Sequence, residues 1–158
     1  MTATAPPLAA AAIIDVESSG LGPDSYPVSV AWRHFGRQGA EGHVLVRPDP
    51  IWGGEWQAEA EAIHGITREQ LRRDGLDPAE AAVRIAEGLA GATPFSDAPA
   101  LDQRWLDMIF ARAAARSGLL TPAVRRLATL FPGADRTTIT TFMARAAEAE
   151  QAVMGCEE

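Results

Sequence analysis

Residues 11–21 read AAIIDVESSGL, an apolar run that ends in two carboxylates, Asp15 and Glu17, followed by a glycine-containing turn. The apolar residues predict a central strand, because a strand that is buried on both sides is apolar on both sides. Side chains two residues apart in a strand point to the same face of the sheet. The two carboxylates are therefore expected to lie together where this strand ends.

Two readings of this carboxylate pair are open. Neighbouring acids repel each other, and a cation between them removes the repulsion. Oxygen ligands suit Mg²⁺ or Mn²⁺, so the pair is a candidate metal site. In the plainer reading, Asp15 and Glu17 are two solvated acids at a strand end.

Two later segments add to the pattern. Residues 62–67 read AIHGIT, and residues 96–106 read SDAPALDQRWL, in which Asp102 precedes an apolar pair. With the Asp-x-Glu pair in front of them, these segments make the chain resemble the DnaQ-like 3′–5′ exonucleases of the DEDD superfamily. The resemblance covers roughly residues 8–110 and is poor beyond them. It implies an RNase H-like α/β fold, with helices packed on a mixed sheet of about five strands.

The resemblance also implies a reaction and a set of metal ligands. The reaction is hydrolysis of a phosphodiester at the 3′ end of single-stranded DNA or RNA, assisted by two Mg²⁺ or Mn²⁺ ions. By analogy with the family, Asp15 would bridge both ions, Glu17 and Glu148 would bind one, and Asp102 would bind the other. In the plainer reading, Asp102 is an acid in the first turn of a helix, which is a favourable position without any metal.

Residues 18–21, SSGL, stand where the family has Thr-Thr-Gly-Leu. The resemblance implies that Ser18 and Gly20 line the site of the terminal nucleotide and that Leu21 lies beside its base. The substitution of serine for threonine is conservative, so the shape of this site is expected to persist.

The third family motif is where the sequence departs. The family has a His, four further residues and an Asp near the start of a C-terminal helix. The best match is MARAAE, residues 143–148, with Met143 in place of the His and Glu148 in place of the Asp. Met143 cannot accept a proton from water, and no shift of the alignment supplies a base. The resemblance therefore implies either a weakened exonuclease or a catalytically inactive pseudo-nuclease that binds nucleic acid or protein.

Two further alternatives concern the C-terminal segment and the function of the whole chain. Residues 132–158 could fold differently from the family, in which case Asp135 competes with Glu148 as the last acid. The chain could also be a structural or partner-binding domain whose acids are incidental. Failure to bind Mn²⁺ would favour that last alternative.

Several other residues have plainer expected roles. His64 belongs to a structural turn in the family, so a structural role is favoured over that of a catalytic base. His34 is expected at the surface, and Trp105 is expected to pack in the core. Trp52 and Trp56, in a glycine-rich segment, could stack on bases or simply pack. Arg104 and Arg145 could reach phosphate, but solvated helix positions are favoured for both.

Composition limits the class of protein. At 158 residues the chain is expected to form one domain. Its net charge of −7 disfavours broad binding to nucleic acid, although a short substrate could still enter a cleft neutralised by metal. All basic residues are arginine, and the single cysteine, Cys156, excludes an internal disulfide. The lack of a signal peptide or long apolar run predicts a cytoplasmic protein without a membrane helix.

The predicted elements follow an α/β pattern. We expect a disordered leader over residues 1–7, a single exonuclease-like domain over 8–155 and a tail over 156–158. Residues 48–61 are expected to be irregular, and 121–131 are either a helix or a helix plus a strand. The predicted strands are 9–16, 28–35, 43–47 and 93–96, and the predicted helices are 67–73, 78–89, 99–116 and 140–154.

Overall fold

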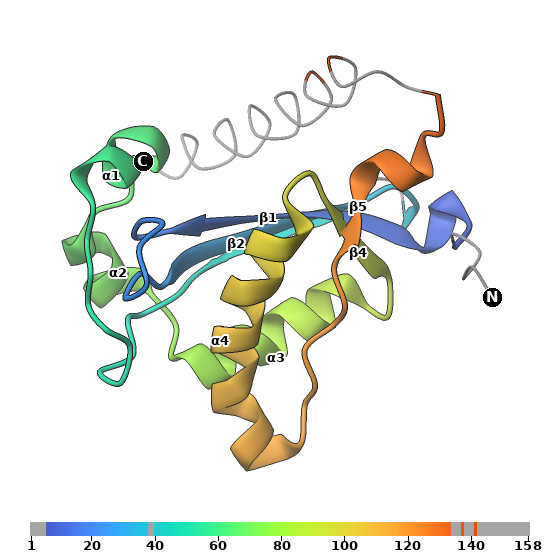
Figure 1. Cartoon of the computed structure of the whole chain (residues 1–158). Coiled ribbons are helices and arrows are strands. Elements are labelled where there is room, and N and C mark those ends of the chain that lie inside the picture. The colour runs from blue at the N-terminus through green and yellow to red at the C-terminus, as the bar shows by residue number, and fades with distance from the viewer. Residues whose placement is uncertain (1–5, 38–39, 134–136, 138–140, 142–158) are drawn as a thin grey trace.

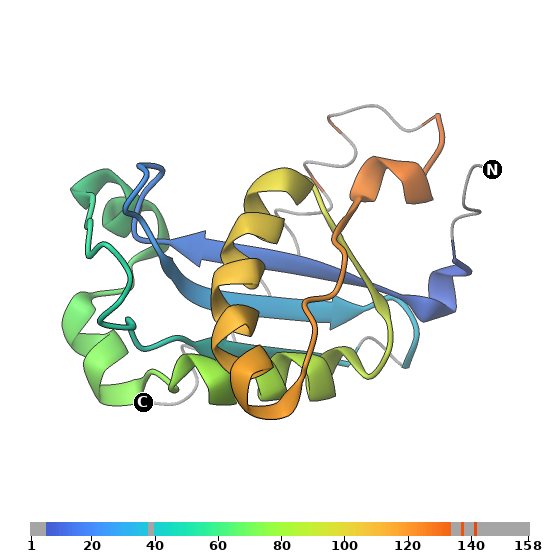
Figure 2. The same cartoon turned by 60° about the horizontal axis from the view of Figure 1, so that its bottom comes forward.

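The computed structural model describes residues 6–37, 40–133, 137 and 141. In this part of the chain, a five-stranded mixed sheet has the order β3-β2-β1-β4-β5. The helices α3 and α4 pack on one face of the sheet, whereas α1 and α2 lie at the end toward which β1 points (Figure 1 and Figure 2). The strands are β1 (Ala11–Ser18), β2 (Pro27–His34), β3 (Glu41–Leu45), β4 (Thr93–Ser96) and β5 (Arg125–Arg126); the helices are α1 (Ala58–His64), α2 (Arg68–Asp74), α3 (Pro78–Leu89) and α4 (Pro99–Ser117).

β1 is the centre of the sheet. It runs antiparallel to β2, with Ile14 opposite Trp32, and parallel to β4, with Ile13 opposite Phe95. The register with β2 shifts between Glu17 and Ser18, at the end of the strand. β2 therefore pairs with β1 through both carboxylates, whereas β4 pairs only with residues 11–13.

The predicted strands are confirmed with small changes in their bounds. β1 starts later than expected, because Leu8–Ala10 form a short 3-10 helix, and it continues to Ser18. Both carboxylates therefore lie within the strand. The undecided segment 121–131 contains the short strand β5 followed by a 3-10 helix, Leu127–Leu130.

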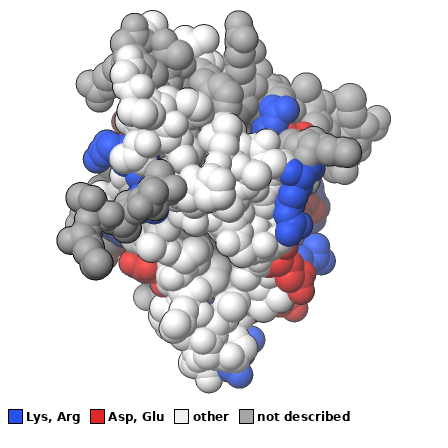
Figure 3. All heavy atoms as spheres, turned by 90° about the vertical axis from the view of Figure 1, so that its right-hand side faces the viewer, with Lys and Arg blue, Asp and Glu red and all other residues white. Residues whose placement is uncertain are grey.

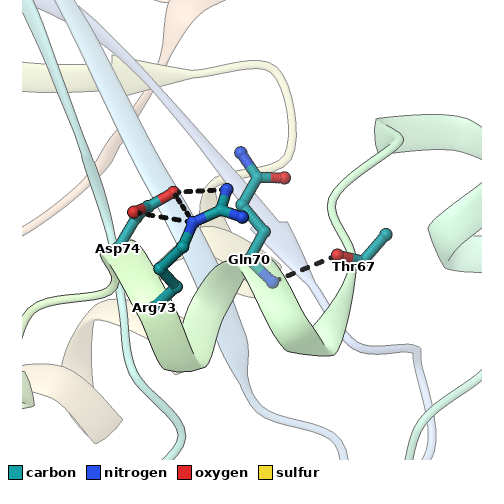
Figure 4. Close-up of polar contacts among 4 residues, drawn as sticks. All are labelled: Thr67, Gln70, Arg73 and Asp74. Carbon is teal, nitrogen blue, oxygen red and sulfur yellow. Dashed lines mark hydrogen bonds and ion pairs between the residues drawn. The ribbon is translucent and has the colours of Figure 1, made fainter.

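Side-chain caps explain why two helices begin where the sequence predicts. Thr67 accepts a hydrogen bond from the backbone N–H of Gln70 at the start of α2 (Figure 4). Asp77 accepts one from the N–H of Ala79 at the start of α3. α4 ends at Gly118, which adopts the left-handed conformation with a φ of 67°. The helix predicted over 140–154 lies outside the described residues.

One helix contradicts the prediction. α1 lies partly within 48–61, which was expected to be irregular. Its first residue follows Gln57, whose side chain makes no capping hydrogen bond, and none of its residues is buried. The segment therefore lacks both the cap and the apolar stripe by which a helix is recognised in sequence.

The main core lies between the sheet and the helices α3 and α4. Ile14 and Trp32 contribute from the sheet, and Ile85, Trp105 and Phe110 contribute from the helices. Trp105 is fully buried, as expected. A smaller cluster includes Ile13 from β1 and Phe95 from β4. Ile13 and Ile14 are neighbours in β1, so this cluster lies on the opposite face of the sheet from the main core. Among the described residues, no helix is long and apolar enough to cross a membrane.

The prediction that His34 lies at the surface is wrong. Its side chain is buried, and its Nε2 donates a hydrogen bond of 2.7 Å to the carbonyl of Gly88. His34 is two residues from Trp32 in the same strand, so both side chains point to the same face, which α3 covers. A Cβ atom at Gly88 would lie 2.2 Å from the Trp32 ring, which shows how closely α3 approaches.

Replacing Ile85 by Ala is expected to destabilise the protein, because this α3 side chain is fully buried in the main core. Such truncations cost about 2–5 kcal/mol through lost burial and the cavity left behind. Val83, on the same helix, is 40% exposed, and Val83→Ala is the matched control, with an expected change below about 1 kcal/mol. Urea unfolding followed by circular dichroism measures both. Equal losses at the two positions would contradict this packing of α3.

Candidate active site

The first part of the site is the carboxylate pair of β1. Asp15 and Glu17 are both partly buried and share one face of the strand. The pKa of Asp15 is raised to about 6, first by burial and then by the charges of Glu17 and Asp97. Burial also raises the pKa of Glu17. The pair is therefore held in surroundings that disfavour negative charge.

Asp102 joins this pair from α4. It lies in the first turn of the helix, and its side chain is 3% exposed. Its Oδ2 accepts a short hydrogen bond from the Ser96 hydroxyl. Burial raises the pKa of Asp102 to about 7; the Ser96 hydrogen bond opposes this rise, whereas the charges of Asp15, Asp97 and Glu17 add to it. The structure thus brings the three sequence-predicted acids close enough to influence one another.

Sequence reasoning missed Ser96 and Asp97. They stand at the end of β4, which is parallel to β1, so both strands end at the same edge of the sheet. The Ser96 Oγ also accepts a hydrogen bond of 2.9 Å from the N–H of Ala98, which fixes the hydroxyl beneath Asp102. The usable signal was a Ser-Asp pair directly after a strand that is parallel to the Asp-x-Glu strand.

The chemistry of these donors fits a hard divalent cation. Carboxylate oxygens are the ligands that Mg²⁺ and Mn²⁺ prefer, and the raised pKa values of Asp15 and Asp102 mark negative charge that a cation would stabilise. Within the described part of the chain, no three His, Cys, Asp or Glu side chains are close enough to form a metal-binding group. Glu148, the fourth predicted ligand, lies outside the described residues.

A cleft of about 230 Å³ opens beside Glu17. Its lining includes Ser18, Gly20 and Leu21, the three residues expected to contact a nucleotide. Leu21 is 70% exposed and Ile63, on α1, is 80% exposed. Two apolar side chains are therefore open to solvent in the cleft that Glu17 also lines. The remaining lining residues are Val16, Gln57, Glu59, Ala60, His64, Leu101 and Trp105.

Long-range hydrogen bonds hold the turn that carries Leu21. The Leu21 N–H donates to Gln57 Oε1 at 3.1 Å, and Gln57 Nε2 donates to Glu55 Oε1 at 2.7 Å. Glu55 Oε2 in turn accepts from the N–H of Asp24 at 3.3 Å. No sequence motif marked Gln57 or Glu55, because these contacts join segments more than 30 residues apart.

Arg104 supports the same turn from the other side. Its Nη2 donates to the carbonyls of Gly22 at 3.0 Å and Pro23 at 3.3 Å, and its guanidinium lies 4.4 Å from the centre of the Trp105 ring. Neither role considered from sequence, a phosphate contact or a solvated helix residue, describes this arrangement. Arg104 connects the turn to α4, the helix that supplies Asp102.

The structural role expected for His64 is confirmed. Its Nδ1 accepts a hydrogen bond of 3.0 Å from the N–H of Ile66, so Nε2 carries the proton and donates to the carbonyl of Ser18 at 3.1 Å. Burial lowers the pKa of His64, which keeps the ring neutral. Both ring nitrogens are engaged, and neither is available to accept a proton from water.

Trp52 and Trp56 pack around Tyr26. Their ring centres lie 6.0 and 6.3 Å from that of Tyr26, and Trp52 is nearly parallel to it. Arg68 lies over the Trp56 ring at 5.4 Å. These contacts favour packing over base stacking for the two tryptophans.

No family model matches the chain. No curated protein matches it in sequence. Solved structures of exonuclease I share its fold. In the metal-free complex of Escherichia coli exonuclease I with single-stranded DNA, the match covers 73% of this chain and 27% of that chain, with a TM-score of 0.56 and 20% identity. Exonuclease I from Methylocaldum szegediense matches with a TM-score of 0.55 and 20% identity, over 73% of this chain and 26% of that one.

These similarities confirm the RNase H-like α/β fold expected from the sequence. The chain spans less than a third of the length of the exonuclease I chains that it matches. A zinc-bound form of the Escherichia coli complex is also among the similar structures.

The buried acids predict a pH dependence of stability. Between the ordinary Asp value of 3.8 and the raised pKa values of Asp15 and Asp102, the folded protein binds more protons than the unfolded chain. Their contribution to stability is therefore full at low pH and is lost as pH rises through about 6 and 7. In EDTA, Asp15→Asn and Asp102→Asn should each be more stable than the original protein at about pH 8, by roughly 1–4 kcal/mol.

Urea unfolding at a series of pH values measures this effect. Asp107→Asn, an exposed position on the same helix as Asp102, is the matched control and should leave the pH dependence unchanged. If Asp15→Asn and Asp102→Asn behave like this control, the carboxylates are not held in a charge-disfavouring environment.

Proposed function

We propose that this chain is a metal-dependent 3′–5′ exonuclease-like protein that acts on single-stranded nucleic-acid ends. The observation that carries the proposal is that Asp15 and Glu17 on β1 lie near enough to the buried Asp102 on α4 for their charges to raise its pKa, with Glu17 lining an open cleft. Proteins that share the fold include exonuclease I in complex with single-stranded DNA, which supports the choice of substrate.

Asp15, Glu17 and Asp102 are the proposed metal ligands, with Glu148 as the fourth. When bound, Mg²⁺ or Mn²⁺ ions would supply the positive charge that phosphodiester hydrolysis requires at the attacking and leaving oxygens. Ser96 orients the Asp102 carboxylate through its hydrogen bond. The roles of the chain itself are thus to hold the carboxylates near one another and to orient Asp102.

The cleft supplies the proposed substrate contacts. Ser18 and Gly20 would lie along the terminal nucleotide, and the exposed Leu21 and Ile63 side chains would contact its base. Such contacts need a base that is not stacked in a duplex, which supports a single strand. The hydrogen bond that the Leu21 N–H donates to Gln57 Oε1 holds the Leu21 backbone before the substrate arrives, so ordering this turn costs little on binding.

The alternative function is that of a catalytically inactive pseudo-nuclease that binds nucleic acid or protein. One observation favours it: His64, the one histidine among the described residues that line the cleft, is engaged at both ring nitrogens. Loss of a general base costs about 10²–10⁴-fold in rate. Met143, at the motif position of the base, lies outside the described residues and cannot accept a proton from water.

Digestion of end-labelled single-stranded DNA and RNA in Mg²⁺ or Mn²⁺ tests the proposal. Release of nucleotides from the 3′ end is expected, and Asp15→Asn or Asp102→Asn should reduce it by about 100-fold or more, because each removes a ligand charge. Asp107→Asn provides an exposed charge control on α4 and should retain the rate. Turnover that is indifferent to Asp15 and Asp102 would contradict the assignment of the site.

Calorimetry with Mn²⁺ separates the two functions. The original protein should bind Mn²⁺, and Asp15→Asn should weaken the binding by at least about tenfold, because a carboxylate ligand is lost. Binding without turnover would favour the pseudo-nuclease. If Mn²⁺ does not bind at all, the acids are incidental and both functions that use them are wrong.

A further inference from the structure

Helix α2 carries three arginines in two different electrostatic situations. Arg73 is held by the neighbouring Asp74, with an Nη2–Oδ2 distance of 2.9 Å and a second contact from Nε (Figure 4). Arg68 and Arg72 are one helical turn apart and are exposed. Among the residues the structure describes, no carboxylate lies within ion-pair distance of either guanidinium. Neither guanidinium is therefore held in an ion pair, although Glu69 lies on the same helix.

Arg68 is also positioned by an aromatic ring. Its guanidinium lies over Trp56 at 5.4 Å from the ring centre. Stacking on a ring leaves the N–H groups at the edge of the guanidinium free to bind an anion. Both arginines also act on the Tyr26 hydroxyl: burial raises its pKa, and the charges of Arg68 and Arg72 oppose the rise.

These arginines lie next to the cleft in the chain. Arg68 follows the cleft-lining His64 by four residues, across the turn that joins α1 to α2. The Trp56 ring meets the His64 ring edge-on, with 6.2 Å between centres, and His64 donates to Ser18 at the end of β1. A continuous set of contacts thus connects the Arg68 surface to the candidate active site.

The charge of the rest of the molecule does not favour binding of a polyanion. The chain has a net charge of −7, so its overall field repels a polyanion. The side that faces away from α1 and α2 is largely uncharged at its centre, with residues of both signs at its margins (Figure 3). A nucleic-acid strand that extends from the cleft toward α2 would meet the positive charges of Arg68 and Arg72.

We propose that Arg68 and Arg72 bind the backbone phosphates of a single strand whose 3′ end occupies the cleft. The proposal rests on the proposed function for the position of that end. The ligand class is a single-stranded polynucleotide, because only a connected series of phosphates reaches both the cleft and α2. A mononucleotide would occupy the cleft alone and would not contact the two arginines.

Fluorescence anisotropy in Mg²⁺ tests this inference. The probe is a labelled oligothymidylate of about 16 nucleotides, with phosphorothioate linkages at its 3′ end to block cleavage. The variant Arg68→Gln/Arg72→Gln should weaken binding by about tenfold and reduce the slope of log K against log salt by about 1.4, since each phosphate contact in a single strand contributes about 0.7. Thymidine monophosphate should bind both proteins equally.

Arg73→Gln is the matched control, because this arginine is on the same helix but paired with Asp74. It should leave the affinity and the salt slope unchanged. Since Arg68 covers Trp56, Arg72→Gln alone serves as the second variant and should lower the slope by about 0.7. An oligouridylate of equal length, compared with the DNA probe, shows which of the two polynucleotides is the better ligand at these arginines.

Three results would overturn the inference: no binding of the oligonucleotides by the original protein, unchanged binding by the double variant, or an equal loss with Arg73→Gln. Its failure can be distinguished from failure of the nuclease assignment. Arginine-dependent binding without any turnover would support the phosphate-binding role of Arg68 and Arg72 and contradict the nuclease assignment. Turnover with binding that does not depend on Arg68 or Arg72 would support the nuclease assignment and contradict this role of the two arginines.

Discussion

The rest of this structure depends on one constraint, the mutual repulsion of the partly or fully buried carboxylates Asp15, Glu17 and Asp102. The central strand places Asp15 and Glu17 on one face of the sheet, and the first turn of α4 holds the buried Asp102 near them. Burial raises the pKa of all three side chains. An arrangement that costs stability in the absence of a ligand is typical of a functional site, where the ligand recovers the lost free energy.

The surrounding structure resists this repulsion by tying separate segments together. Arg104 connects α4 to the turn after β1, and Gln57 connects that turn to the start of α1. Because these contacts reach backbone atoms, they fix the path of the chain as well as the side chains. Arg104 thus couples the helix that supplies Asp102 to the turn that follows the strand with the other two acids.

Features that depend on local interactions could be predicted from the sequence. The caps at Thr67 and Asp77 act within three residues, and the apolar run before Asp15 fixes the central strand. The RNase H-like fold followed from these elements together with the family resemblance. Features that depend on contacts between distant segments could not be predicted, because no local pattern encodes them. The role of Gln57 is an example. The burial of His34 is different, because it follows from the two-residue period that places His34 on the same face as the buried Trp32.

Charge in this protein is separated over short distances. The acids of the cleft would repel the phosphates of a substrate, and a bound cation would reverse that sign only where the acids lie. Attraction beyond the cleft must come from elsewhere. Arg68 and Arg72 follow the cleft-lining His64 closely in the chain and make no ion pair among the described residues. Local charge, rather than the net charge of −7, therefore decides whether a single strand can be held. An acidic protein can bind a polyanion when some of its arginines make no ion pair and lie where the bound strand runs.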